Sequence, residues 1–367
     1  MNGRAVAWHV PVLNERRAGL RYRCLYPMEL LRQAGVPAML FKQAEASAYS
    51  SVIFDAWTLF PSVSTPAQIS QLLELVDRLR QQGTRIVLDN CDNQFAATPN
   101  ASWTNACEQL RVLAQQADVV LCCSEQLATV MQQECQLAER PRVVEDPIET
   151  SIRYTGDRWW RSLLSPRRKL SWLRHSQHHQ ALARERSRGI TPLVWFGAHG
   201  NHFADGGMLD LLQVLPVLKE IALEHGISLT IISNHRGKFE QHFSQLDFPT
   251  HYLDWDRVTF LQALRLHDIA LLPVVDNAFT RCKSANRLSL ALHHGLNVVA
   301  DPLPSYQRFA NCSQLGRWKD GLQAYLGDAK LRSEHLRSGQ ALVQAHFGPQ
   351  AITGQWLRAL DLSKERV

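Results

Sequence analysis

The stretch DIALLPVVDNAFTRCKSANRLSLALHHGLNVVAD, residues 268–301, decides the fold. It opens with an apolar run typical of a buried strand. It then passes through a polar loop into apolar residues at helical spacing, which stop at Gly295. A second apolar run, LNVVAD, follows at once. A strand, a crossover helix and a strand in this order predict a parallel sheet with helices on both faces.

The same alternation runs through both halves of the chain, so we expect an α/β protein with two doubly wound, Rossmann-like parallel-sheet domains facing a cleft, and helices at the C-terminus. Strands are expected at 4–10, 36–41, 50–57, 84–89, 117–124, 142–148, 227–235, 268–275 and 296–301, and at the start of 192–201. Helices are expected at 27–35, 66–83, 106–116, 125–134, 208–226, 259–267, 284–295, 331–347 and 351–364.

Charge divides the chain of 367 residues into parts. The net charge is −3 over 1–150 (13 basic, 16 acidic), +8 over 151–190 (10 basic, 2 acidic) and +1 over 191–367 (17 basic, 16 acidic). We therefore predict an N-terminal domain at 1–150, a basic linker or insertion at 151–190, a second domain at 191–335, and C-terminal helices at 336–367 that return to the first domain.

Composition narrows the class of protein. The sequence is 45% hydrophobic and 20% charged, which is typical of a globular protein with real cores. It has no apolar run of transmembrane length and no apolar N-terminal run long enough for a signal peptide. The eight cysteines show no CxxC spacing, so neither a zinc site nor a disulfide framework is expected. These features indicate a reducing, cytoplasmic location.

The polar loop inside 268–301 carries the strongest functional signal. Arg281, Lys283, Ser284 and Asn286 follow an expected strand end and open an expected helix. Basic residues at a helix N-terminus oppose the helix dipole unless an anion is present, so this cluster predicts a phosphate or diphosphate site. A solvated helix start is the alternative. Asp276 just before could cap the turn or reach a sugar hydroxyl.

Other expected strand ends in the second half also carry polar groups. Gly197 opens the loop that ends at Asn201, where the backbone could approach a phosphate closely. Asn234 ends the next strand, and Asp254 with Trp255 could offer an acceptor and an aromatic face to a base. Each alone could be an ordinary polar loop. Together they favour a nucleotide, although the dinucleotide motif Gly-x-Gly-x-x-Gly is missing.

The first half offers candidates for an acceptor or cleft site. ERRAGLRYR (15–23) places Arg21 and Arg23 around Gly19, and LDNCDNQF (88–95) follows an expected strand. Asp89, Asp92 and Asn93 in the second segment could bind a hydroxyl or act as general base. A basic surface loop and a turn or helix cap are the alternatives.

Five segments carry a resemblance to the GT-B-fold glycosyltransferases, most like the retaining family-4-type group. They are LRYRCLYPMELLRQAG (20–35), ADVVLCCSEQLATVM (117–131), RVVEDPIE (142–149), LVWFGAHGN (193–201) and 268–301, quoted above. The resemblance implies transfer of a sugar from a nucleotide diphosphate donor to an acceptor hydroxyl, in polysaccharide or glycolipid synthesis. The nucleotide-sugar would be a substrate, with no cofactor and no metal.

On this interpretation Arg281, Lys283 and Asp92 are the candidate catalytic residues. The second domain would hold the donor and the first would hold the acceptor. The chain departs from the family where a pair of glutamates is usual, because those positions hold Cys282 and Leu290. A catalytically silent GT-B-like nucleotide- or glycan-binding protein therefore stays open as the alternative function, and a sugar-nucleotide epimerase of the same fold as a weaker one.

The basic segment 151–190 interleaves Trp159, Trp160 and Trp172 with ten Lys and Arg residues. This mixture suits peripheral contact with an anionic membrane at its inner face, or a lipid-linked acceptor. An inter-domain helical pair is the alternative. No nucleic-acid module is recognisable, so nucleic acid is not an expected partner.

Overall fold

The computed structural model describes residues 5–97, 99–149, 166–200 and 206–362. The predictions for Asn201, Trp159 and Trp160 lie outside these ranges. By its contacts the chain divides into two units. Unit 1 comprises Met1–Ile148, Arg281–Ala285 and His346–Val367, and unit 2 comprises Glu149–Thr280 and Asn286–Ala345.

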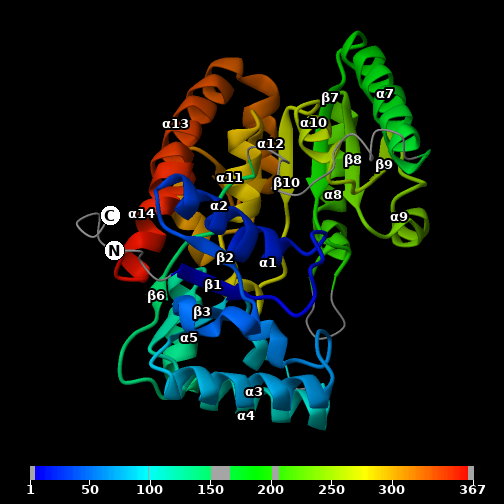
Figure 1. The fold of residues 1–367 in the computed structure, drawn as a ribbon. Coiled ribbons are helices and arrows are strands. Elements are labelled where there is room, and N and C mark those ends of the chain that lie inside the picture. Colours follow the sequence, from blue (N-terminus) through cyan, green and yellow to red (C-terminus); the bar gives the residue numbers. More distant parts are fainter. Residues whose placement is uncertain (1–4, 98, 150–165, 201–205, 363–367) are drawn as a thin grey trace. The chain divides into compact units, whose positions relative to one another are not determined.

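Unit 1 is built on a parallel sheet of six strands in the order β2-β1-β3-β4-β5-β6 (Figure 1). The strands are β1 (Ala5–His9), β2 (Ala38–Leu40), β3 (Tyr49–Asp55), β4 (Arg85–Asn90), β5 (Val119–Cys122) and β6 (Arg142–Val143). The helices are α1 (Ala18–Leu20), α2 (Tyr26–Gln33), α3 (Pro66–Gln81), α4 (Ala101–Gln116), α5 (Glu125–Glu134) and α14 (Pro349–Ala359), with a π-helix at Arg21–Leu25 and 3-10 helices at Gln43–Ala48, Ala56–Leu59 and Gln94–Ala96.

Unit 2 holds a second parallel six-stranded sheet, in the order β12-β11-β10-β7-β8-β9. Its strands are β7 (Thr191–Phe196), β8 (Ile227–Ser233), β9 (Thr250–Asp254), β10 (Ile269–Leu272), β11 (Asn297–Ala300) and β12 (Gln314–Leu315). Its helices are α7 (Pro166–Arg186), α8 (Leu215–Glu224), α9 (Arg236–His242), α10 (Phe260–Leu264), α11 (Asn286–His293), α12 (Trp318–Gly327) and α13 (Ala329–Phe347), with 3-10 helices at Met208–Gln213 and Pro304–Phe309. The 3-10 helix Thr280–Cys282 and the last two residues of α13 extend into segments of unit 1. The prediction of two doubly wound parallel sheets is confirmed.

Apolar strands and one-sided helices explain these sheets. β8 is buried at all seven positions, as expected for a central strand covered on both faces. The α3 helix begins at a capping box made by Thr65 and Gln68, and its end is marked by Gly83 at a positive φ of 75°. Gly35 and Gly295 likewise follow α2 and α11 with positive φ, so the helix stop predicted at Gly295 is confirmed.

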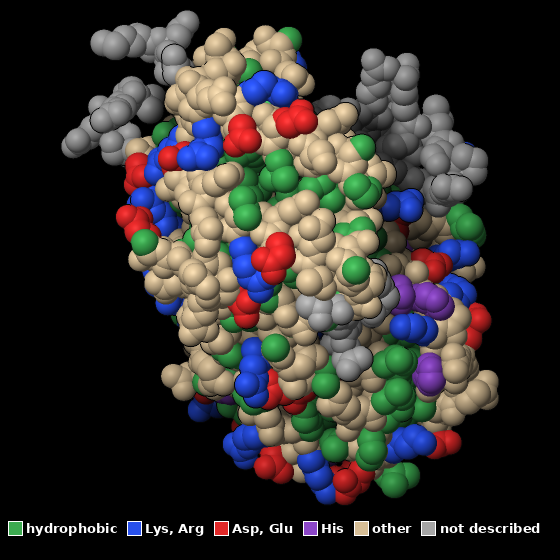
Figure 2. All heavy atoms as spheres, turned by 90° about the horizontal axis from the view of Figure 1, so that it is seen from below, with side chains coloured by type: hydrophobic (Ala, Val, Ile, Leu, Met, Phe, Trp, Pro, Cys, Tyr) green, Lys and Arg blue, Asp and Glu red, His purple; other side chains and the backbone are tan. Residues whose placement is uncertain are grey.

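One face of the molecule carries charged side chains of both signs. On the face shown in Figure 2, basic and acidic side chains lie interspersed. Exposed pairs such as Arg111 with Glu108 in α4, 2.6 Å apart, are of this kind. Such pairs contribute little to stability.

Candidate functional site

The loops after β7 and β8 in unit 2 are tied to each other by hydrogen bonds. Ser233 Oγ donates to the carbonyl oxygen of Gly197 at 2.9 Å, and the backbone N–H of His199 donates to Asn234 Oδ1 at 3.0 Å. The carboxyl ends of neighbouring parallel strands meet at one edge of a sheet, which is where ligands of such folds bind. The structure thus brings together Gly197 and Asn234, two of the predicted donor-binding residues.

Two basic side chains that the sequence prediction did not select lie at these loops. Lys238 Nζ donates to the carbonyl oxygen of His199 at 3.2 Å. Arg287 Nη1 lies 3.4 Å from where a Cβ on Gly197 would be, so a side chain there would crowd the guanidinium. Burial lowers the pKa of His199, and the Lys238 charge lowers it further. The positive charge of Lys238, a smaller cause of that shift than burial, would favour an anion such as a diphosphate here.

One carboxylate, Asp210, lies beside this basic group. Its Oδ2 accepts a hydrogen bond from the Gly207 backbone N–H at 2.9 Å. Burial raises the pKa of Asp210, while the Gly207 hydrogen bond and the Arg287 charge act in the opposite direction. Arg287 stands one residue after Asn286, inside the basic run of the sequence. No sequence signal marked Lys238 or Asp210.

Glycine is required at two positions, Gly200 and Gly207, whose backbones lie against each other after β7. Gly200 and Gly207 have positive φ of 130° and 107°, and a Cβ on Gly207 would lie 2.5 Å from the Gly200 backbone nitrogen. No side chain fits at that distance. The backbone can therefore keep this conformation only while both positions are glycine.

The predicted cluster at 281–285 belongs to unit 1 and is tied there at several points. Lys283 Nζ forms an ion pair with Asp92 Oδ1, whose other oxygen accepts the Trp57 indole N–H at 2.8 Å. Ser284 Oγ donates to Asp146 Oδ2 at 2.5 Å. Ser124 Oγ donates to the carbonyl oxygen of Cys282 at 2.7 Å.

These ties change what Lys283 offers a ligand. Burial acts to lower the pKa of Lys283, but the Asp92 carboxylate outweighs it and the pKa is raised. The ammonium is therefore charged and already neutralised by Asp92. The structure brings together the predicted catalytic pair Lys283 and Asp92. Arg281 and Asp276 are exposed, and Asn286 is half-exposed at the start of α11.

Three of the predicted acceptor-site residues form buried structural contacts. Arg23 is 5% exposed and binds Asp89 through two hydrogen bonds, of 2.6 and 3.0 Å. Its remaining Nη1 group donates to the Val144 carbonyl and lies 3.3 Å from Asp146. Arg21, 2% exposed, donates to the carbonyl oxygens of Glu15 and Arg16.

The other two predicted residues of unit 1 have ordinary local surroundings. Asn93 Oδ1 accepts the Phe95 backbone N–H at 3.2 Å and caps the 3-10 helix Gln94–Ala96. A Cβ on Gly19 would meet Cys91 Sγ at 3.6 Å, an ordinary contact distance. A ligand role for either residue stays a prediction.

A small cavity of about 30 Å³ lies at the ends of β1, β3 and β4 in unit 1. Arg17 and Asp55 line it with their side chains one-third exposed and 3.6 Å apart. Burial raises the pKa of Asp55 to about 6. A carboxyl group with such a pKa can accept and return a proton near neutral pH. The sequence analysis missed Asp55, although it ends an apolar strand-like run.

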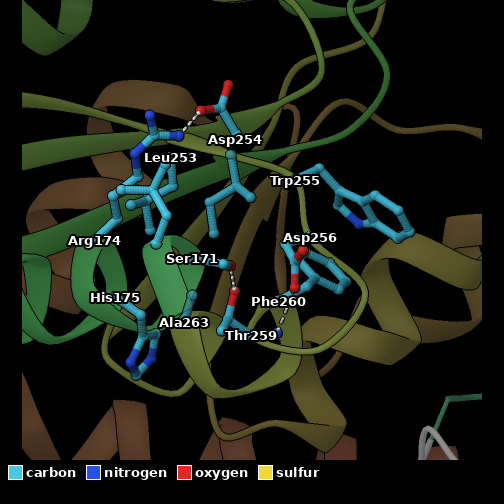
Figure 3. Close-up of a pocket in the computed structure, with 12 residues that line it drawn as sticks. Ser171, Arg174, His175, Leu253, Asp254, Trp255, Asp256, Thr259, Phe260 and Ala263 are labelled. Carbon is cyan, nitrogen blue, oxygen red and sulfur yellow. Dashed lines mark hydrogen bonds and ion pairs between the residues drawn. The ribbon is translucent and has the colours of Figure 1, made fainter. Parts of the chain in front are cut away.

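A larger cavity of about 180 Å³ in unit 2 is lined by α7, β9 and α10 (Figure 3). Its walls are mainly apolar, and Ser171 and Thr259 share a hydrogen bond of 3.2 Å inside it. At its rim Asp254 accepts hydrogen bonds from Arg174 at 2.8 Å and Arg236 at 3.2 Å. Trp255 also lines it, so the two residues predicted to contact a base lie together here.

Neither a metal cluster nor a membrane-crossing helix emerges from the described residues. No group of three His, Cys, Asp or Glu side chains in that part of the chain is placed to hold a metal ion. Within the same ranges, every helix is too short or too polar to cross a bilayer.

No family model and no curated protein matches the sequence. The chain is similar in structure to Anabaena Alr3699/HepE in complex with UDP-glucose, with 13% identity, 97% of this chain and 99% of that one covered, and a TM-score of 0.60. It is also similar to sucrose-phosphate synthase from Thermosynechococcus elongatus, with 13% identity, 98% of this chain and 99% of that one covered, and a TM-score of 0.62. A third similar structure is WaaG, a glycosyltransferase involved in lipopolysaccharide biosynthesis, with 14% identity, 95% of this chain and 98% of that one covered, and a TM-score of 0.59. At these identities the likeness establishes the GT-B fold.

Proposed function

We propose that the protein is a glycosyltransferase that moves a sugar from a nucleotide diphosphate donor to an acceptor hydroxyl. The observation that carries the proposal is the position of two basic side chains at the loop after β7: Lys238 donates to the carbonyl oxygen of His199, and Arg287 lies beside Gly197. The GT-B fold supports it, as does the UDP-glucose in the similar Anabaena structure.

Unit 2 supplies the donor site in this proposal. Arg287 and Lys238 bind the diphosphate, and the backbone around Gly197 lies against it. The bond from the anomeric carbon to the diphosphate oxygen breaks, and the acceptor oxygen takes its place on that carbon. The two cations stabilise the negative charge that grows on the departing nucleoside diphosphate. We propose that these two cations neutralise the diphosphate in place of a metal ion.

The cavity lined by Trp255 takes the nucleobase. A cavity of roughly 150 Å³ holds one benzene ring, so about 180 Å³ suits one aromatic ring system. Its apolar walls supply contact area, and Ser171 and Thr259 supply hydroxyl groups that can hydrogen-bond to the edge of a base.

Unit 1 supplies the acceptor site. The Asp55 carboxylate accepts the hydrogen bond of the acceptor hydroxyl and takes its proton, and Arg17 holds the carboxylate in place. Lys283 and Asp92 remain the other catalytic candidates. Retention of configuration, and an acceptor that is a glycan or a lipid-linked glycan, follow from the family-4 resemblance.

Isothermal titration with a panel of nucleotide diphosphates and their sugars tests the donor site. Arg287→Ala and Lys238→Ala should each weaken the best ligand by about tenfold or more, because each removes a charge-assisted hydrogen bond. Arg317→Ala, at an exposed arginine of unit 2, is the matched control and should bind normally. Equal affinity in all four proteins would overturn the proposal. Release of free sugar from a bound donor separates an active enzyme from a silent binding protein.

A further inference from the structure

We propose that the N-terminal half of α7 docks on an anionic lipid bilayer. Three large apolar side chains lie exposed within four residues of this helix: Leu170 at 46%, Trp172 at 40% and Leu173 at 54%. Clustered exposed apolar groups mark interaction sites, whereas scattered ones are ordinary. The proposal concerns a surface of unit 2 and does not depend on the transferase activity.

The charge of the helix identifies the partner. The α7 helix, Pro166–Arg186, holds six Lys and Arg residues and one acidic residue, Glu185, which lies in its second half. Lys169 and Arg174 are exposed in the same half as the apolar side chains. Arg174 is paired with Asp254 at 2.8 Å, so Lys169 is the better-placed contact for a lipid phosphate. A helix with Trp and Leu beside basic residues is typical of interfacial binding to anionic lipid.

The two halves of α7 differ in how they pack. His178, Leu182 and Glu185 in the second half are buried, and His178 lies 3.3 Å from Thr230 Oγ1 of β8. The first half instead forms one wall of the cavity in Figure 3, through Leu170 and the three labelled residues Ser171, Arg174 and His175. The second half thus packs its side chains against the sheet of unit 2, whereas the first half is joined to unit 2 by the polar contacts of Ser171 with Thr259 and of Arg174 with Asp254. The first half keeps its apolar side chains available to a partner.

Lipid fits this half of the helix better than a protein or a nucleotide does. Trp172 and Leu173 do not line the cavity, so a base bound there would leave both exposed. Protein interfaces are depleted of lysine at their centres, whereas membrane-surface helices are rich in Lys and Arg. The bilayer supplies hydrocarbon for the tryptophan and leucine and phosphate for the lysine in one surface.

Co-sedimentation of the full chain with vesicles tests the proposal. We expect the protein to sediment with phosphatidylcholine vesicles that contain about one-third phosphatidylglycerol, and much less with phosphatidylcholine alone. Salt at about 0.5 M should weaken the binding several-fold. Trp172→Ser combined with Leu173→Ser should lower the partition coefficient by about tenfold, since both side chains enter the interface. Lys169→Glu should lower it by several-fold.

Leu223→Ser is the matched control, because Leu223 is an apolar side chain of unit 2 that is 90% exposed on α8. It should sediment like the unaltered protein. Affinity for nucleotide should be the same in all variants, which separates this surface from the donor site. Failure of the unaltered protein to sediment with the anionic vesicles would overturn the proposal. The proposal would also be overturned if Leu223→Ser lowered the partition coefficient as much as Trp172→Ser with Leu173→Ser does. If the unaltered protein instead self-associates through these residues, the surface belongs to a second copy and the proposal is wrong.

Discussion

At the scale of single residues, the buried arginine of unit 1 shows how one side chain organises several elements. Arg23 joins Asp89 of β4 to Val144 and Asp146, which follow β6, and its guanidinium lies 5.4 Å from the Trp356 ring. A buried carboxylate tolerates its charge only with such a partner. In the sequence, Arg23 stands among other basic residues, which also suited a role in binding a ligand anion. The sequence could not separate that role from a structural ion pair, because the guanidinium serves in both.

We expect Arg23→Ala to lower the free energy of unfolding by about 3–5 kcal/mol, because it leaves Asp89 buried without its cation. Urea unfolding monitored by circular dichroism measures the change. Asp89→Asn combined with Arg23→Met should recover much of the loss. A single Arg23→Ala variant as stable as the unaltered protein would show that the pair is not a structural anchor.

Gly207→Ala should weaken nucleotide binding by about tenfold or more while leaving the sheet of unit 2 folded. The added Cβ would collide with the backbone of Gly200, so the loop must move. Titration with the best nucleotide, together with a thermal melt, checks both parts. Gly327→Ala is the control, because a Cβ there meets nothing within 4 Å. Unchanged affinity in Gly207→Ala would remove this loop from the donor site.

At the scale of elements, periodicity predicted the central strands and long helices well, and α5 was predicted with the bounds that it has. The predictions were wrong where local backbone geometry determines the type and the bounds of a helix. The single helix expected at 208–226 is a 3-10 helix followed by α8, and Pro216 stands at the start of the latter. The basic loop expected at 15–23 is largely α1 and a π-helix. Within it, Arg21 binds the nearby carbonyls of Glu15 and Arg16, and Arg23 makes long-range contacts with Asp89.

The packing of α7 against its sheet should depend on pH. Burial lowers the pKa of His178 to about 2 and that of His267 to about 3, from 6.5. They face His251 of β9, and Glu185 and Arg186 of α7. Unfolding lets both rings take up protons below pH 6.5. Their contribution to stability is therefore complete above that pH and is lost as the pH falls.

From pH 7.5 to pH 5 we expect each buried histidine to account for ~2 kcal/mol of lost stability. Urea titrations across this range measure the slope. His178→Gln should remove about 2 kcal/mol of this pH dependence, the contribution of one buried histidine. His179→Gln, at an exposed position of the same helix, should not change it. Equal slopes in all three proteins would contradict the assignment.

At the scale of the whole molecule, the C-terminal helix α14 is part of unit 1 although it lies far from the rest of unit 1 in the sequence. Trp356 is fully buried and stacks edge-on with Trp8 of β1, with ring centroids 5.7 Å apart. Arg85 and Arg142 both bind Asp361, just beyond the helix. The contacts of α14 therefore span several strands of the sheet.

Trp356→Ala should destabilise unit 1 by about 3–5 kcal/mol, since it opens a cavity beside β1. Asp361→Asn should cost only about 1 kcal/mol, because that carboxylate is more than half exposed. Thermal melts of both variants measure which one loses more stability. Arg358→Ala, at an exposed position of the same helix, is the control. A larger loss in Asp361→Asn than in Trp356→Ala would reverse this account.

The distribution of unit 1 over three stretches of chain has a consequence for synthesis on the ribosome. Every segment of unit 2 has been made by Ala345, but unit 1 still lacks α14 at that moment. Trp8 is therefore synthesised long before its partner Trp356. We therefore expect nascent chains that stop before Pro349 to be the species most in need of chaperones.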